Sequence, residues 1–222
     1  MVRGRLDDVR HRITVAGGDP ERVAVVAVTK GHGLEAALAA LALGVVDLGE
    51  NYASALLDKA AGVESLGDEA PVSPRWHFLG AVQRNKVPRL APIVACWQGV
   101  SRPEEAVAIA RRRPHAEVFV EIDTTGDATR AGCAPAEAER VVEAARRAGC
   151  TVRGLMTVAP FGAGTSVIQS AADAFGTVAG LAATLGLGEL SMGMSHDLEQ
   201  AVAAGSTMIR VGTALFGERP PK

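Results

Sequence analysis

Short apolar runs alternate along the chain with alanine-rich stretches of helical periodicity. Apolar runs of about four to eight residues are typical of buried strands, whereas apolar residues spaced three or four apart indicate helices. Strands are predicted at 23–28, 45–48, 76–80, 93–97, 118–122, 152–156, 189–192 and 208–211. Helices are predicted at 34–43, 53–61, 103–112, 135–148, 171–185 and 197–204.

This alternation predicts a parallel sheet with right-handed crossovers. Eight nearly continuous apolar strands suit a closed barrel that is covered on both faces. The alternative is a doubly wound open sheet, but the GxGxxG pattern that usually follows its first strand is absent from the sequence. We therefore predict an α/β fold, a single-domain (β/α)₈ TIM barrel over residues 1–222.

An extra helix is predicted before the first strand. Leu6, Val9 and Ile13 lie on one helical stripe, and the run Gly-Gly-Asp-Pro at 17–20 ends it. Two segments without periodicity, 62–74 and 159–170, are predicted to be loops and candidates for mobility.

Composition excludes several classes of function. The formal net charge of −2 leaves no basic footprint for nucleic acid. No apolar run approaches the ~20 residues needed to cross a bilayer. The polar amphipathic start is unlike a signal peptide, and the three widely spaced cysteines show neither metal-ligand spacing nor a disulfide framework. We expect a cytoplasmic monomer with reduced thiols and no metal site.

Unusual polar residues fall where the predicted strands end, at the rim that carries function in barrels. Lys30 closes the first strand. Partial burial there would favour the neutral amine, which can attack an aldehyde, so Lys30 is a candidate Schiff-base lysine. The alternative is a lysine that reaches solvent or pairs with Glu50.

Two clusters near the end of the chain resemble a phosphate cradle. Ser191 to Ser195 follow the seventh strand, and Gly212 and Thr213 follow the eighth. Glycines and helix N-termini at these two positions of a barrel often bind phosphate. Ser195 is also predicted to cap the helix that begins near Asp197. The alternative for each residue is ordinary turn chemistry.

Arg210 is predicted to lie on an inward face of the eighth strand, with Met208 and Gly212. A guanidinium buried there needs an acceptor. A carboxylate or a pyridine nitrogen would serve, and the structural alternative is an ion pair with Asp47 or Glu121.

Five segments carry a family resemblance: AVTK at 27–30, LGENY at 48–52, WHFLGAVQRNK at 76–86, RGLMTVAP at 153–160 and SMGMSHDLEQAVAAGSTMIRVGTALFG at 191–217. In this order they resemble the pyridoxal-phosphate homeostasis proteins, a YggS/PROSC-like family related in fold to the N-terminal domain of alanine racemase. Departures from its usual pattern are Gly31-His32-Gly33, Ser54-Ala55, Arg130 and His196.

The resemblance implies that the cofactor is pyridoxal 5′-phosphate (PLP), held as a Schiff base on Lys30. It implies that the phosphate lies among Ser191, Ser195, Gly212 and Thr213. It further implies that Arg210 faces the pyridine nitrogen, and that Asn51, His77 and Met156 surround the ring or its approach.

We expect storage or delivery of PLP, in support of PLP homeostasis and amino-acid balance, rather than catalysis. Arg210 cannot accept a proton, so the ring nitrogen would stay unprotonated and the electron sink weak. Only five residues follow Gly217, so the C-terminal β-domain that completes the related racemases is expected to be absent. PLP-dependent apoenzymes are candidate partners.

Three alternatives stay open. A racemase or lyase of low activity would use Tyr52, His32 or His77 as a base. A partner-binding module would use PLP as a structural group or a signal. A Schiff-base aldolase would act on a phosphosugar, which the resemblance argues against.

Overall fold

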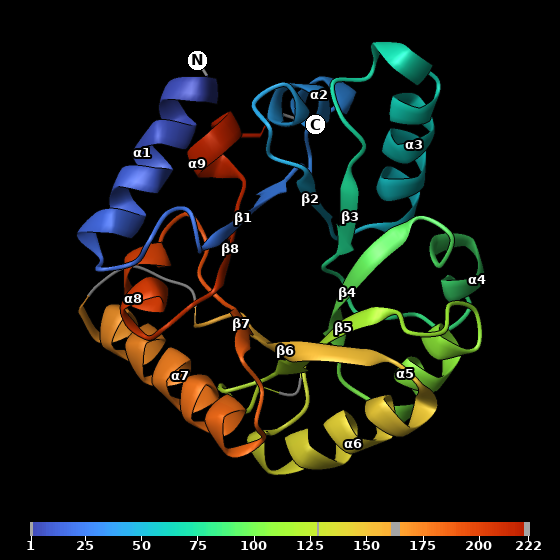
Figure 1. The fold of residues 1–222 in the computed structure, drawn as a ribbon. Helices are drawn as coiled ribbons and strands as arrows, with labels where there is room; N and C mark the ends of the chain where they lie inside the picture. The colour runs from blue at the N-terminus through green and yellow to red at the C-terminus, as the bar shows by residue number, and fades with distance from the viewer. Residues whose placement is uncertain (1, 128, 161–164, 220–222) are drawn as a thin grey trace.

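The computed structural model describes residues 2–127, 129–160 and 165–219, and for residues 165–169 it describes the backbone only. Parallel strands close into a barrel in which each strand pairs with the next along the chain and β1 pairs with β8 (Figure 1). The predicted (β/α)₈ barrel is therefore confirmed. The strands are β1 (Ala24–Val28), β2 (Asp47–Glu50), β3 (Arg75–Phe78), β4 (Val94–Val100), β5 (Glu117–Ile122), β6 (Thr151–Thr157), β7 (Glu189–Ser191) and β8 (Met208–Val211).

Helices surround the barrel (Figure 1). They are α1 (Val2–Val15), α2 (Leu34–Leu41), α3 (Ala53–Glu64), α4 (Val87–Leu90), α5 (Pro103–Ala110), α6 (Ala138–Ala148), α7 (Thr165–Thr184), α8 (Leu198–Ala203) and α9 (Thr213–Phe216), with 3₁₀ turns η1 (Gly67–Glu69) and η2 (Pro135–Glu137). The predicted extra helix is α1, which packs against α8 and α9 through its buried stripe of Leu6, Val9 and Ile13. Helix α1 thus packs on the two helices that follow β7 and β8.

The predicted loops are shorter than expected. Helix α3 continues to Glu64 and η1 follows, so residues 62–64 and 67–69 of the first predicted loop are helical. Helix α7 begins at Thr165 rather than 171, while residues 161–164 of the second predicted loop lie outside the described residues. Helices α4 and α9 were not predicted, because four residues are too few to establish a 3.6-residue period.

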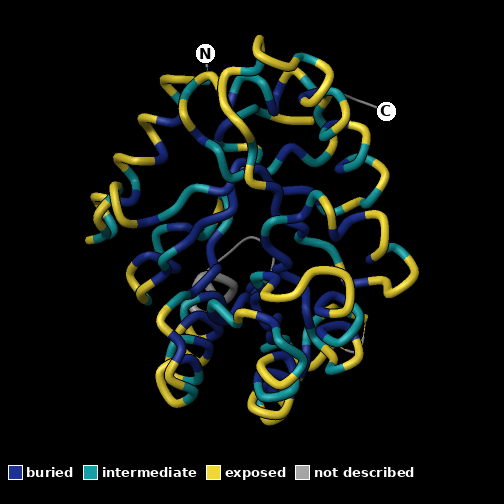
Figure 2. Tube along the Cα trace, turned by 45° about the vertical axis from the view of Figure 1, so that its right-hand side comes forward, coloured by how far each residue is buried: buried dark blue, intermediate teal, exposed yellow. Residues whose placement is uncertain are grey.

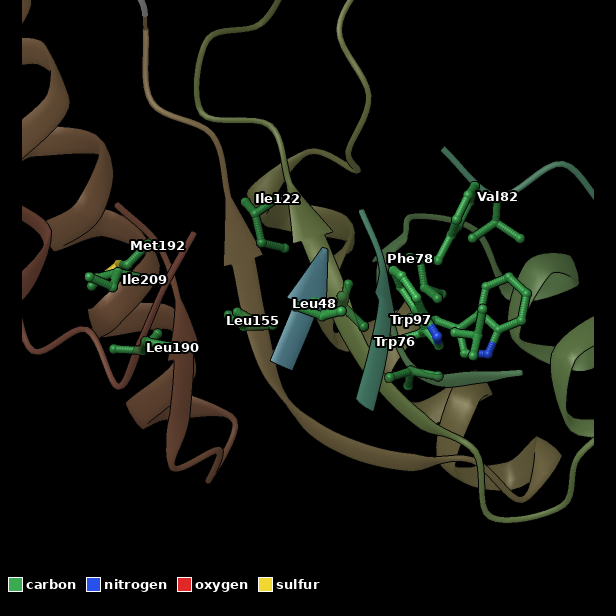
Figure 3. Packing of buried hydrophobic residues seen from close by; sticks show 14 of the residues in the cluster. Leu48, Trp76, Phe78, Val82, Trp97, Ile122, Leu155, Leu190, Met192 and Ile209 are labelled. Atoms are coloured by element: carbon green, nitrogen blue, oxygen red, sulfur yellow. The ribbon is translucent and has the colours of Figure 1, made fainter. Parts of the chain in front are cut away.

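Buried side chains form two apolar layers, and burial is concentrated around the barrel (Figure 2). A small cluster fills the barrel interior and consists of Val26, Cys96, Phe119, Met156 and Met208. The larger cluster packs strands against helices; Figure 3 shows Leu48 and Leu155 in it, and a group of aromatic residues at β3 and β4. Because successive strand residues alternate between these layers, Arg210, paired with Val26 in the β1–β8 register, belongs to the interior.

Candidate functional site

A cavity of about 450 Å³ opens at the carboxyl ends of the strands, a volume within the usual range for small-molecule sites. Seven of the nine predicted site residues line it: Lys30, Asn51, Met156, Ser195, Arg210, Gly212 and Thr213. The other two, His77 and Ser191, do not line it and lie within the barrel. The fold therefore brings residues from β1, β2, β6, β7 and β8 to one place.

Lys30 follows β1 by two residues and is half-buried at the cavity. Its Nζ lies 5.2 Å from the centroid of the Tyr52 ring, a cation–π distance. The pairing with Glu50 that the sequence left open is not found, because Glu50 forms its ion pair with Lys59. The Lys30 amine thus reaches the cavity without a carboxylate partner in the described part of the chain.

Arg210 is buried, and among the described residues its hydrogen-bond partners are neutral groups. Its Nη1 donates to Ser191 Oγ at 2.8 Å, and its Nη2 donates to the Thr157 carbonyl at 2.7 Å. Burial away from water lowers the pKa of Arg210 to about 10, and the negative charge of Glu121 only partly opposes this. Neither Asp47 nor Glu121 forms an ion pair with it, so the structural alternative suggested by the sequence is wrong. A guanidinium has five N–H donors, so capacity remains for a ligand.

A chain of hydrogen bonds runs beneath Arg210 through the barrel. Ser191 Oγ donates to Gln98 Oε1 at 2.6 Å, and Gln98 Nε2 lies 2.7 Å from His77 Nδ1. His77 Nε2 in turn lies 2.9 Å from Asp47 Oδ1. With the amide N–H donating, Nδ1 of His77 is the acceptor and Nε2 carries the hydrogen. Ser191 therefore bonds Arg210 directly, and His77 is linked to Arg210 through Gln98 and Ser191.

Asp47 ends this chain at the opposite rim of the barrel. Burial by itself would raise its pKa, but the hydrogen bond and charge of His77, together with Arg75 and Arg153, hold the pKa below its ordinary value. Gln98 was missed in the sequence. Its place on β4, two residues after the inward-facing Cys96, is the signal that could have found it.

The cavity wall formed by α9 and the segment after β7 is polar. Ser195 Oγ accepts a hydrogen bond from the backbone N–H of Ala214 at 3.1 Å, which ties the two segments together. The predicted capping of α8 by Ser195 is wrong: Asp197 occupies the N-cap position. A Cβ at Gly212 would come within 2.9 Å of the Val28 carbonyl oxygen, so the close approach of β8 to β1 requires glycine.

Several residues that were not predicted as PLP contacts also line the cavity: Val28, His32, Leu79, Val158, Met194, His196 and Arg219. Arg219 packs over Gly31, where a Cβ would lie 2.7 Å from Arg219 Cδ. The pKa of His32 is lowered, chiefly by burial and then by the positive charges of Lys59 and Arg219. His32 and Arg219 belong to the two segments that flank the Lys30 side of the cavity.

Glu121 is a second buried group near Arg210. Its side chain is 6% exposed, and its Oε2 atom has no hydrogen-bond partner among the described residues. Burial raises its pKa to about 7, against the opposing charges of Arg210 and Arg130. It lines a smaller cavity of about 200 Å³ with Asp123 and Arg130, and this cavity shares Val158 with the larger one.

The described residues contain no cluster of three or more His, Cys, Asp or Glu side chains that could hold a metal ion. Among the helices in the described ranges, none combines the length and apolarity needed to cross a membrane.

Known proteins resemble the chain over nearly its whole length. Residues 5–220 match the family model of the alanine racemase N-terminal domain. A pyridoxal phosphate homeostasis protein of Pseudomonas aeruginosa is 36% identical over 216 residues, covering 95% of this chain and 91% of that protein. One of Deinococcus radiodurans is 37% identical over 215 residues, covering 95% and 97%.

A solved structure agrees with these relatives. PipY of Synechococcus elongatus, determined with PLP bound, superposes with a TM-score of 0.84 at 29% identity, covering 98% of this chain and all of that one. Sequence and fold thus point to one family along the entire barrel. This chain belongs to the family of pyridoxal phosphate homeostasis proteins, whose barrel is the alanine racemase N-terminal type of domain.

Proposed function

We propose that this protein binds PLP covalently through Lys30, as one domain over residues 1–222, and serves PLP homeostasis by storing or delivering the cofactor. When bound, PLP supplies an aldehyde that reacts with amines and a ring that can act as an electron sink. The observation that carries the proposal is the meeting of the Lys30 amine and the buried Arg210 guanidinium in one cavity of about 450 Å³.

The residues of the cavity fit the chemical groups of PLP. Lys30 has an amine for the aldehyde, and Arg210 has spare N–H donors for the ring nitrogen. Ser195 and Thr213 have hydroxyl groups for the phosphate, and Gly212 lets the main chain approach closely. Asn51 and Met156 line the same space and would flank the ring.

His77 and Ser191 have indirect roles in this proposal. Ser191 accepts a hydrogen bond from Arg210, and His77 holds the Gln98 amide that orients Ser191. Both orient the guanidinium without touching the ligand.

A carrier fits this cavity better than a catalyst does. Arg210 is a donor only, and none of the described residues that line the cavity has a carboxylate that could keep a proton on the ring nitrogen. Of the bases considered for a racemase or lyase, His77 has both ring nitrogens engaged inside the barrel. Tyr52 is 59% exposed, so water would compete at that position. His32 lines the cavity, and it is the remaining candidate for residual catalysis.

We also propose that the protein is a cytoplasmic monomer that passes PLP to PLP-dependent apoenzymes. Cys96, Cys133 and Cys150 are free and buried, which suits a reducing compartment. Burial raises the pKa of the Cys133 and Cys150 thiols to about 11, so neither is poised for redox chemistry. Sedimentation of the purified protein and transfer of PLP to an added apoenzyme test these two points.

Reduction with borohydride tests the covalent assignment. Wild type incubated with PLP should gain one reduced adduct, and peptide mapping should place it on Lys30. Lys30→Ala should gain none, because the amine is gone. Lys86→Ala serves as the matched control and should behave as wild type. An equally tight, reducible adduct in Lys30→Ala would show that another amine holds the cofactor.

An assay of amino-acid turnover with the same preparation distinguishes the carrier hypothesis from the enzyme hypothesis. We expect no turnover that depends on His32 or Tyr52. Catalysis that His32→Ala abolishes would favour the racemase or lyase instead.

A further inference from the structure

A second lysine, Lys59 of α3, is buried, with an exposed fraction of 6%. Its Nζ donates to the Thr29 carbonyl at 2.7 Å and to Thr29 Oγ1 at 3.1 Å, and it forms an ion pair with Glu50. Lysine is almost never buried unless it is paired. All three ammonium hydrogens of Lys59 thus have acceptors on the ends of β1 and β2.

The carboxylate in this cluster is equally well partnered. Glu50 is fully buried; it accepts from Thr29 Oγ1 at 2.9 Å and from the backbone N–H of Asn51 at 3.2 Å. The cluster is therefore a closed network of two charges and one hydroxyl, whereas the partners of Arg210 in the described part of the chain are neutral.

The network acts on the two residues that immediately precede cavity residues. Thr29 precedes Lys30, and the carbonyl to which Lys59 donates belongs to the peptide group that joins them. Glu50 precedes Asn51 and holds its N–H. The ammonium of Lys59 therefore restrains the peptide planes from which the side chains of Lys30 and Asn51 leave the main chain.

The charge of Lys59 also reaches the cavity. After burial, which is the largest cause, it is the next contribution to the lowered pKa of His32. Stability alone is a weak reason to keep such a pair, because well-packed apolar residues often replace a buried ion pair without loss. The ion pair also holds the peptide group that precedes Lys30, and apolar residues in its place could not do this.

We propose that Lys59 is a positioning residue that aims the Lys30 amine into the cavity and thereby sets the rate of covalent PLP capture. This inference rests on the proposed function of Lys30. A misplacement of about 1 Å at a reacting group can cost up to about a hundredfold in rate. We expect removal of the Lys59 ammonium to slow capture about tenfold or more.

The test compares Lys59→Met, the double variant Lys59→Met/Glu50→Gln, and Lys86→Met, which removes a lysine outside the network. Each cofactor-free protein is mixed with PLP well below its unfolding temperature and is reduced with borohydride at successive times. The adduct on Lys30 is quantified by mass. Rates at several PLP concentrations separate the limiting capture rate from the concentration that gives half of it, and thermal unfolding is recorded for each variant.

Lys59→Met should unfold at a lower temperature, because Glu50 is left as an unpaired buried charge. The double variant removes that charge and should recover thermal stability, but its limiting capture rate should stay about tenfold or more below wild type. Lys86→Met should match wild type in both measurements.

Three results would overturn the proposal. Recovery of both stability and capture rate in the double variant would make Lys59 purely structural. A wild-type capture rate in Lys59→Met would also show that Lys59 does not position Lys30. Failure of both Lys59 variants to fold would place its role in the fold itself. Absence of a Lys30 adduct in the wild-type arm would instead refute the proposed function, so the two failures are distinguishable.

Discussion

The two ends of the barrel differ in whether their charged side chains form ion pairs. At the end where the strands begin, charged side chains pair with one another. Arg75 lies 3.2 Å from Asp47 and 2.9 Å from Glu117, and Arg153 lies 2.7 Å from Glu117 and 2.5 Å from Glu189. Arg75 and Arg153 thus each have two carboxylate partners at this end.

At the end where the strands finish, the cations of the cavity have no such partners. Within the described ranges, Lys30, Arg210 and Arg219 form no ion pair, and the nearby Glu50 is already engaged by Lys59. Positive charge without a protein counter-ion favours an anionic ligand with an acceptor atom, as PLP has. The comparison teaches that unpartnered charge marks the binding end and paired charge marks the structural end.

The strongest way to break this comparison is Arg210→Met. Loss of a buried charged donor that contacts a ligand costs about 3 kcal/mol, roughly 150-fold in affinity. We expect PLP affinity to fall by about that factor, while the unfolding temperature of the cofactor-free protein stays level or rises because a desolvated cation has gone. Equilibrium titration and thermal unfolding check the two parts.

Arg210→Lys is the matched control for charge. Its ammonium is a point donor and cannot copy the fork that reaches both Ser191 and Thr157. Affinity should therefore recover only in part. Wild-type affinity in Arg210→Met would contradict the division of roles between the two ends.

Glu121→Gln tests a buried carboxyl group on the cavity side, whose Oε2 atom has no hydrogen-bond partner among the described residues. Because burial raises its pKa from 4.5 to about 7, the folded state holds the proton more tightly than the unfolded chain. This contribution to stability is complete below about pH 4.5 and is lost as the pH rises through about 7. At about 1.4 kcal/mol for each pKa unit, the loss is about 3 kcal/mol.

We therefore expect Glu121→Gln to unfold less readily than wild type at pH 8, by up to about 3 kcal/mol, and the advantage to shrink toward pH 5. Denaturant unfolding at several pH values measures it. An advantage that is the same at every pH would mean that Glu121 does not titrate in this range.

The smallest effect is expected at the opposite end, from Arg153→Met. Arg153 is 35% exposed in its side chain, and pairs of this exposure contribute ~1 kcal/mol or less. The variant should lose about that amount of stability, with capture of PLP by Lys30 unchanged. A clear loss of capture would show that the two ends are coupled through Asp47 and the buried chain above it.

Sequence pattern was sufficient for the barrel and for most of the cavity. Each of the eight apolar runs overlaps one strand of the barrel, and the position of Lys30 after the first run led directly to the cavity. Residues that end a strand can be placed this way, because the carboxyl ends of parallel strands meet at one rim. Short helices such as α4 and α9 carry too few residues for a periodic signal.

Residues whose role depends on a partner across the barrel could not be placed from pattern. Ser195 has the sequence context of a cap for the helix that follows it, yet its hydroxyl bonds α9 instead. Lys59 has the context of an ordinary helix lysine. Only the approach of α3 to the ends of β1 and β2 makes it a buried ion pair.

The sequence by itself determined the order of strands and helices, the inward face of Arg210 and the lysine at the end of the first strand, because these follow from local periodicity. The tertiary structure alone decided which charges find partners: Glu50 goes to Lys59 rather than Lys30, and Arg210 meets Ser191 and Thr157 rather than a carboxylate. The physical reason is that pairing depends on distances of a few ångströms between residues far apart in the chain, and only strand register and helix packing set those distances.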